Sequence, residues 1–314
     1  MVNLKIKLPQ DFFEEKTEYG FTVDVERKKI WAVELDLLNE FDRVCKNHNL
    51  TYMLSFGSLL GAIRHKGFIP WDDDVDVIMK REDYDTLLKI GPSEFQHPYF
   101  FQNPITEKSR YFRPHCQLRN SLTTGLIKGD EEREINRGIF LDIFVLDKMP
   151  SKKVSKHYQR AFSLCVLAEY LMRCRNYSRT TSLSFGMPMK SIVQWLIGHI
   201  IPMDNSKYFQ IWNWHESRYK NRQCDALVQS LRHDRYRVYS DPSIWDKVVE
   251  TDFETLRVTI PARYSDLLRL WYKDWETPRN IPCVHNGMTA SADISYIDYL
   301  KQSTNEESTD NRSI

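Results

Sequence analysis

The chain has no dominant charge and no closely spaced cysteine pair. Its 314 residues carry 44 Lys+Arg against 43 Asp+Glu, so the formal net charge is +1. Nucleic-acid-binding domains are usually markedly basic, so this balance predicts no nucleic-acid partner and requires any anion binding to be local. The six cysteines are scattered without a C-x-x-C pair, which is typical of reduced thiols in a cytoplasmic protein. His115-Cys116 and Cys283 with His285 come nearest to a zinc motif but lack the usual ligand spacing.

Long apolar runs are also missing. Charges interrupt the N-terminus within a few residues, so it has no signal-peptide core. The longest apolar runs, 161–172 and 192–203, fall short of the ~20 residues that span a bilayer, and Glu169 and His199 interrupt them. We therefore predict no transmembrane segment and a cytoplasmic protein, with peripheral contact at the inner face of the membrane left open.

A turn of small residues stands out from this generic background. Gly57 and Ser58 follow a short strand predicted at 51–56, and Ser58 would cap a short helix at 59–64. The N–H groups at the start of a helix favour anions. We therefore expect a phosphate to approach Gly57 and Ser58.

Carboxylates follow this turn. The alternating pattern at 74–79 predicts a strand with Asp74 and Asp76 on one face. Adjacent carboxylates repel, and a divalent cation removes this cost; oxygen-only ligands suit Mg²⁺ or Mn²⁺. A lone D-x-D motif is more often a solvated strand start, so context must support the metal site. An EF-hand loop starting at Asp72 is rejected because Val77 takes the position of the required glycine.

A third carboxylate lies later in the chain. Asp142 sits in the middle of an apolar strand predicted at 138–147. An unpaired charge is costly to bury there, so Asp142 should pair with a cation or belong to a site. Together with Asp74 and Asp76, it would complete a metal-binding triad.

Basic side chains alternate along a strand predicted at 112–119. Arg113, His115 and Arg119 would share one face of this strand. They could meet a diphosphate, or they could form a solvent-facing stripe, because antiparallel sheets often keep one face wet. Both interpretations stay open.

Helices are predicted on either side of these strands. Residues 23–49 show helical periodicity, with a charged face that includes Lys28, Glu34, Asp36 and Glu40. Beyond residue 150, aromatic-rich helices are predicted at 155–175, 189–201 and 206–222. The apolar residues Trp195, Leu196, Ile200 and Ile201 could face a membrane, but we favour a core position because this segment lacks a Lys/Arg-rich polar face.

Residues 57–76 closely resemble the signature of the LicD family, which includes bacterial phosphocholine transferases and relatives of fukutin-related protein. The segments 117–124, 138–144 and 253–264 support the resemblance, which covers residues 31 to 275 and is tightest in the first half. It implies an α+β fold with a nucleotidyltransferase-like mixed sheet flanked by helices and a helical annex.

The resemblance also implies a reaction. A phospho-alcohol, phosphocholine or a polyol phosphate, would pass from a CDP-activated donor to a hydroxyl of a cell-surface glycan or a lipid-linked precursor. Mg²⁺ or Mn²⁺ would bind to Asp74, Asp76 and Asp142, and Asp72 or Asp142 would act as general base. The expected donor-binding residues are Gly57, Ser58, Arg64, Lys66 and Arg119. Two alternatives remain: a nucleotidyltransferase that uses an NTP on a small molecule or protein, and a non-catalytic nucleotide- or glycan-binding module.

The predicted organisation has five parts. They are an N-terminal arm (1–22), the nucleotidyltransferase-like core (23–150), a helical acceptor-side region (151–246), a C-terminal strand and helix that complete the core (247–302), and a disordered tail (303–314).

Overall fold

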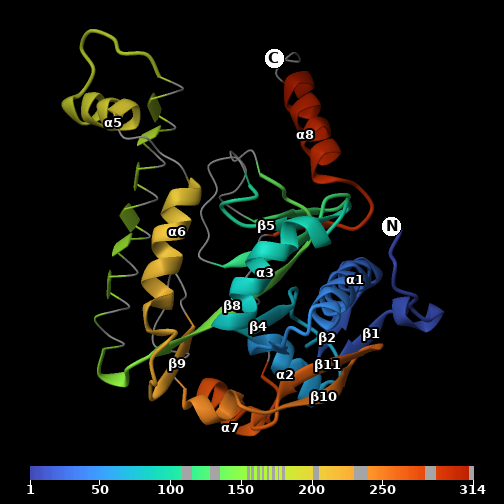
Figure 1. Cartoon of the computed structure of the whole chain (residues 1–314). Helices are drawn as coiled ribbons and strands as arrows, with labels where there is room; N and C mark the ends of the chain where they lie inside the picture. The colour runs from blue at the N-terminus through green and yellow to red at the C-terminus, as the bar shows by residue number, and fades with distance from the viewer. Residues whose placement is uncertain are drawn as a thin grey trace.

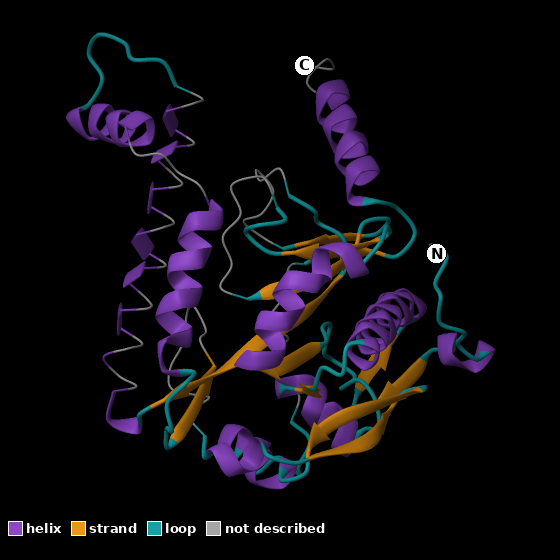
Figure 2. Ribbon diagram, viewed as in Figure 1, coloured by secondary structure: helices purple, strands orange, loops and turns teal. Residues whose placement is uncertain are grey.

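A mixed sheet organises the structure. The computed structural model describes residues 1–107, 115–127, 135–153, 181–200, 205–229, 240–279 and 288–310, and parts of 156–178. The sheet order is β3-β4-β8-β6-β5, and β9 pairs with the far end of β8 (Figures 1 and 2). Its strands are β3 (Tyr52–Leu54), β4 (Asp76–Lys80), β5 (Tyr99–Gln102), β6 (Cys116–Asn120), β8 (Phe140–Met149) and β9 (Ala226–Gln229).

The central strands β4 and β8 run parallel, whereas the other neighbours in this sheet are antiparallel. Their residues are buried almost throughout, because helices α1 (Val25–Asn47) and α3 (Arg81–Glu94) pack on the sheet. This burial explains the continuous apolar runs of β4 and β8. The mixed α/β architecture predicted from the sequence is confirmed.

Helix α1 forms where it was predicted, but its charged face is not exposed. Asp24 caps it by accepting from Arg27 N, and Glu34, Asp36 and Glu40 are all buried. The N-terminal segment covers the part of this face that holds Asp36: the N–H groups of residues 5 and 6 donate to Asp36 Oδ1 at 2.7 and 2.8 Å. The charged face predicted from the sequence is therefore present, but residues distant in the sequence bury Glu34, Asp36 and Glu40 on it.

The helix after the turn starts earlier than predicted. Helix α2 (Phe56–Arg64) has Ser55 as its N-cap residue, so Ser58 lies in the first turn instead of capping it. Strand β4 likewise begins at Asp76, which leaves Asp74 in the preceding loop. As a result, Ser58 lies inside α2 and not before it, and Asp74 lies in a loop and not on the strand.

The C-terminal part returns to the core. The hairpin β10 (Val248–Phe253) and β11 (Leu256–Pro261) packs beside β3 and α2, and its buried residues share one hydrophobic core with the sheet. Helix α7 (Tyr264–Tyr272) follows. Strand β12 (Thr289–Ser291) then pairs with β7 (Thr124–Leu126), ahead of helix α8 (Tyr296–Asp310). Helix α8 therefore includes residues 303–310, which had been predicted to be disordered.

Helices of the annex extend from the far end of β8 (Figure 1). Helices α5 (Met189–Ile200) and α6 (Asn205–Glu216) match two of the predicted helices. The segment at 226–229, predicted as part of a helical region, instead adds strand β9 to the sheet. Among the helices that the structure describes, none is both long and apolar enough to cross a bilayer.

Candidate metal centre

Three carboxylates meet at the adjacent strands β4 and β8. Asp76 pairs directly with Asp142 in the parallel register. One carboxylate oxygen each from Asp74, Asp76 and Asp142 lies within 4.8 Å of the others. Asp76 and Asp142 are only 8% and 6% exposed. The structure thus brings together the three residues predicted as a triad, although Asp74 reaches the group from a loop.

The backbone around Asp76 is held on two sides. Asp142 N donates to Val75 O at 2.9 Å, and Ser55 N donates to Asp76 O at 2.9 Å. Ser58 Oγ accepts from Asp76 N at 2.8 Å. Ser58 therefore fixes the position of Asp76, a role that the sequence did not indicate.

A buried chain of polar side chains supports Asp142. Gln117 Nε2 donates to Asp142 Oδ1 at 2.6 Å, and His115 Nε2 lies 3.2 Å from the same oxygen. Arg119 donates to Gln117 Oε1 at 2.7 Å and to Gly138 O at 2.7 Å. Because Arg119 is 1% exposed, it lies behind the triad and not at a donor-accessible surface.

Gln117 was missed as a site residue, although its signal was present. The alternation along a strand places 115, 117 and 119 on one face. The predicted basic stripe includes His115 and Arg119, and the neutral Gln117 lies between them on the same face of the strand. Arg113, the third member of that stripe, lies outside the described residues, as do Ile201 and the Cys283 and His285 pair.

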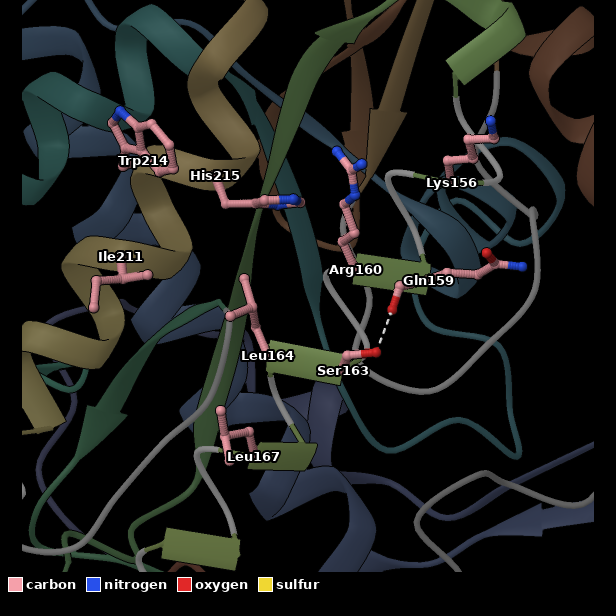
Figure 3. A pocket seen from close by; sticks show the side chains of 9 residues that line it. All are labelled: Lys156, Gln159, Arg160, Ser163, Leu164, Leu167, Ile211, Trp214 and His215. Carbon is pink, nitrogen blue, oxygen red and sulfur yellow. Dashed lines mark hydrogen bonds between the residues drawn. The ribbon is translucent and has the colours of Figure 1, made fainter. Parts of the chain in front are cut away.

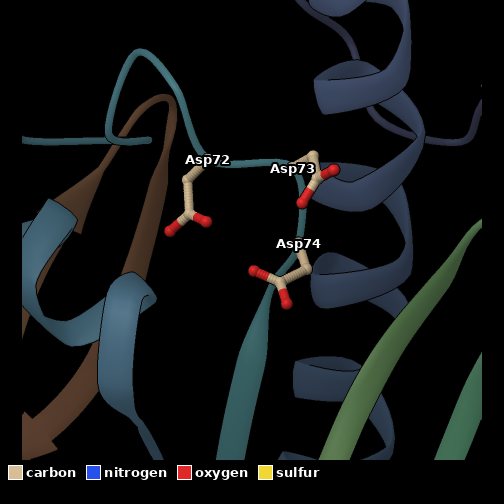
Figure 4. A group of neighbouring side chains, drawn as sticks. All are labelled: Asp72, Asp73 and Asp74. Carbon is tan, nitrogen blue, oxygen red and sulfur yellow. The ribbon is translucent and has the colours of Figure 1, made fainter. Parts of the chain in front are cut away.

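A second acidic group adjoins the triad. Asp72, Asp73 and Asp74 each place a carboxylate oxygen within 4.8 Å of the others (Figure 4). Helix α1 holds this loop: Arg27 Nη1 and Trp31 Nε1 donate to Asp72 O at 2.8 and 3.2 Å. All three carboxylates are partly exposed.

Asp72 lies against the small turn. A Cβ atom at Gly57 would come 2.3 Å from Asp72 Oδ2. A larger residue at this position would displace the Asp72 carboxylate, so Gly57 serves the acidic loop as well as the start of helix α2. A carboxylate beside the first turn of a helix is also electrostatically favourable.

Glu34 adds a buried carboxyl group to the same region. Its side chain is 1% exposed, and Oε2 has no hydrogen-bond partner among the described residues. Burial, followed by the charges of Asp74, Asp73 and Asp72, holds its pKa well above the usual range. Helical periodicity places Glu34 on the charged face of α1 and does not indicate that its side chain is buried.

The other predicted donor-binding residues lie around the same loop. Arg64 donates to His65 Nε2 and to Trp275 O, both at 2.9 Å. Lys66 is exposed and adopts a positive φ of 60°. Its carbonyl accepts from Glu254 N at 2.7 Å, which connects the loop to the β10–β11 hairpin.

A groove opens in the annex, and none of its lining residues belongs to the triad. It has a volume of about 790 Å³ and lies between the 156–178 segment and α6 (Figure 3). Apolar side chains and two cationic residues share its wall. Among its lining residues are Lys156, Arg160, Leu164, Leu167, Ile211 and Trp214.

Residues 49–163 match the model of the LicD/FKTN/FKRP nucleotidyltransferase domain, and this range contains the whole triad. The chain thus contains a LicD-family domain, and the resemblance predicted from the sequence is confirmed.

Relatives extend this similarity beyond the matched domain. The chain is 26% identical over 259 residues to the lipopolysaccharide cholinephosphotransferase LicD of Haemophilus influenzae, covering 77% of this chain and 88% of the relative. It is also 30% identical over 114 residues to an uncharacterized protein of Rickettsia prowazekii, covering 36% of this chain and 39% of that protein.

Proposed function

We propose that this protein transfers phosphocholine or a polyol phosphate from a CDP-activated donor to a hydroxyl of a cell-surface glycan or its lipid-linked precursor, with Mg²⁺ or Mn²⁺ as cofactor. The observation that carries the proposal is the grouping of Asp74, Asp76 and Asp142 within 4.8 Å, inside the matched LicD-family range. Similarity to a lipopolysaccharide cholinephosphotransferase over 77% of the chain supports the type of group transferred.

The residues fit a hard divalent cation. Two nearly buried carboxylates, paired across parallel strands, would repel each other strongly unless a positive charge joined them. All-oxygen ligand sets suit Mg²⁺ and Mn²⁺. When bound to Asp74, Asp76 and Asp142, the cation would neutralise the donor diphosphate and the charge that develops during transfer.

The chain's own groups would guide the rest of the reaction. The acceptor hydroxyl oxygen bonds to the phosphorus that carries the alcohol, and the diphosphate bond breaks, so that CMP leaves with the bridging oxygen. Asp72 is proposed to take the hydroxyl proton, because it is partly exposed beside the triad, whereas Asp142 is held by Gln117. Exposed Lys66, together with Arg64 and the α2 start at Gly57 and Ser58, is proposed to lie near the donor phosphates.

The groove of the annex is proposed as the acceptor side. Lys156 and Arg160 would attract an anionic glycan, and Trp214, 69% exposed, offers a face for a sugar ring. This assignment agrees with the expectation that residues 151–246 set acceptor specificity.

The test measures CMP release from CDP-choline, CDP-ribitol and CDP-glycerol, with a glycan acceptor and with Mg²⁺ or EDTA. We expect Mg²⁺-dependent turnover of one donor, and a loss of at least 100-fold in Asp76→Asn, which removes charge from the triad. Activity that survives this substitution would exclude the assigned mechanism. Pyrophosphate release from an NTP would instead favour the nucleotidyltransferase alternative, and donor binding without turnover would favour a binding module.

A further inference from the structure

Helix α5 carries an apolar stripe on its outward face. The exposed fractions of Met189, Val193, Leu196 and Ile200 are 74%, 42%, 42% and 72%. Their spacing of four, three and four residues places them on one side of the helix. Gly198 is the one buried residue of α5. The core position favoured from the sequence is therefore wrong for Leu196 and Ile200, whereas Trp195 is half-buried.

Contacts on the opposite face fix this orientation. Arg175 Nη1 donates to Gly198 O at 3.0 Å, and Trp195 Nε1 donates to Thr181 O at 2.9 Å. A Cβ atom at Gly198 would lie 2.2 Å from Cys174 O, so the backbones approach closely there. Rotation of α5 to bury its stripe would break these contacts.

The loop before α5 extends the same surface. Leu183 is 46% exposed and the side chain of Phe185 is fully exposed, just ahead of the helix. Figure 1 shows α5 and this loop at the end of the annex farthest from the sheet. We call the six residues of this surface the apolar tip: Leu183, Phe185, Met189, Val193, Leu196 and Ile200.

The sequence around the apolar tip is free of acidic residues. Residues 170–203 contain no Asp or Glu but include Arg173, Arg175, Arg179 and Lys190. This segment therefore has a formal charge of +4, whereas the rest of the chain carries −3, because the total is +1. The exposed Lys190 on α5 and the absence of acidic residues in this segment suit an anionic, apolar partner. Pairing two copies of this surface would bring like charges together, which argues against self-association.

We propose that the apolar tip docks on a lipid bilayer that contains anionic headgroups, with α5 lying in the plane of the interface. Its 12 residues extend about 18 Å, too short to cross the hydrocarbon core, so the helix would lie on the membrane. The apolar stripe would enter the acyl boundary, while Lys190, which is exposed on the same helix, would meet lipid phosphates. This inference does not depend on which donor or acceptor the enzyme uses.

Flotation of the purified full chain with vesicles tests the proposal. We expect co-flotation with vesicles of phosphatidylcholine and phosphatidylglycerol, with less binding to phosphatidylcholine alone or at high salt. Phe185→Asp with Ile200→Asp should lower partitioning at least tenfold. The milder Phe185→Ser should lower it less, and Leu270→Asp, at a 50% exposed position on α7, should leave it unchanged.

Two controls keep the outcomes distinct. The far-ultraviolet circular dichroism and thermal midpoint of each variant should match those of the wild type, because the altered side chains are exposed. Wild-type protein that binds neither vesicle, or a double variant that binds both as well as the wild type, would overturn the proposal. If light scattering shows that the wild type is a dimer and the double variant a monomer, the apolar tip would instead mediate self-association.

Discussion

At the scale of single residues, the orientation of one amide determines how Asp142 is presented. A guanidinium has only donors, so Gln117 must turn its oxygen toward Arg119 and its NH₂ group toward Asp142. Asp142 Oδ1 thereby receives a hydrogen bond at 2.6 Å from a side chain that is itself held in place. The buried Arg119 acts on the carboxylate through Gln117, as outer-shell partners of metal ligands commonly do.

Gln117→Leu should weaken the cation site without removing a ligand. We expect the Mg²⁺ concentration at half-maximal activity to rise 10- to 100-fold, the usual effect of losing an outer-shell partner. The measurement is a Mg²⁺ titration of CMP release, together with a Mg²⁺-dependent thermal shift. Gln96→Leu, at an exposed position, is the matched control. An unchanged Mg²⁺ requirement in Gln117→Leu would show that this hydrogen bond does not tune the triad.

At the scale of elements, the β10–β11 hairpin holds the loop that leads from α2 to the carboxylates. Glu254 Oε1 accepts from Phe68 N at 3.1 Å, and Glu254 N donates to Lys66 O. The ring centroids of Phe253 and Phe68 lie 4.9 Å apart. A Cβ atom at Gly67 would come 2.0 Å from Glu254 Oε1, so the clasp requires glycine there. The distant C-terminal hairpin therefore sets the path of the signature loop.

Removal of this clasp should destabilise the fold and the loop together. Glu254→Ala should lower the free energy of unfolding by about 1–3 kcal/mol, because the buried Phe68 N–H loses its acceptor. Glu254→Gln keeps an acceptor and should cost less. Urea denaturation measures both, with the exposed Glu250→Gln as control.

The carboxyl group of Glu254 also makes the stability of the fold depend on pH. Burial raises the pKa of Glu254, so its contribution is fully present below the ordinary value of 4.5 and is lost as pH rises through the raised pKa. The wild type should therefore lose stability relative to Glu254→Gln as pH rises above 4.5. A pH-independent difference would contradict the assigned burial.

The sequence predicted these elements where the signal was local. Alternation around Asp76 and an isolated acid in an apolar strand located two members of the triad, and the strands that carry them are adjacent in the structure. Burial of Asp36 could not be predicted, because it depends on the N-terminal segment, and burial of Glu34 could not be predicted, because it lies near the distant Asp72–Asp74 loop. The supporting roles of Gln117 and Glu254 depend equally on contacts between distant segments, which helical or strand periodicity does not encode.

At the scale of the whole molecule, buried polar contacts connect the sheet to the annex. Arg81 Nε donates to Asp147 Oδ1 at 2.7 Å, and both side chains are at most 2% exposed. Arg81 Nη1 also donates to Asn213 Oδ1 on α6. On the same helix, His215 Nδ1 lies 2.8 Å from Glu216 Oε1. One guanidinium thus bridges the β8 end of the sheet and the helix that lines the annex groove. The position of the groove relative to the triad depends on this bridge.

Because Asp147 is fully buried, the loss of its partner should be costly. Arg81→Met leaves this carboxylate without its cation and should lower the free energy of unfolding by about 3–5 kcal/mol. Lys148→Met breaks an exposed pair with Glu82 and should cost at most about 1 kcal/mol. Arg81→Met/Asp147→Leu should recover part of the loss, since apolar pairs can replace buried ion pairs. Equal losses in Arg81→Met and Lys148→Met, measured by urea denaturation, would show that the bridge does not hold the annex to the sheet.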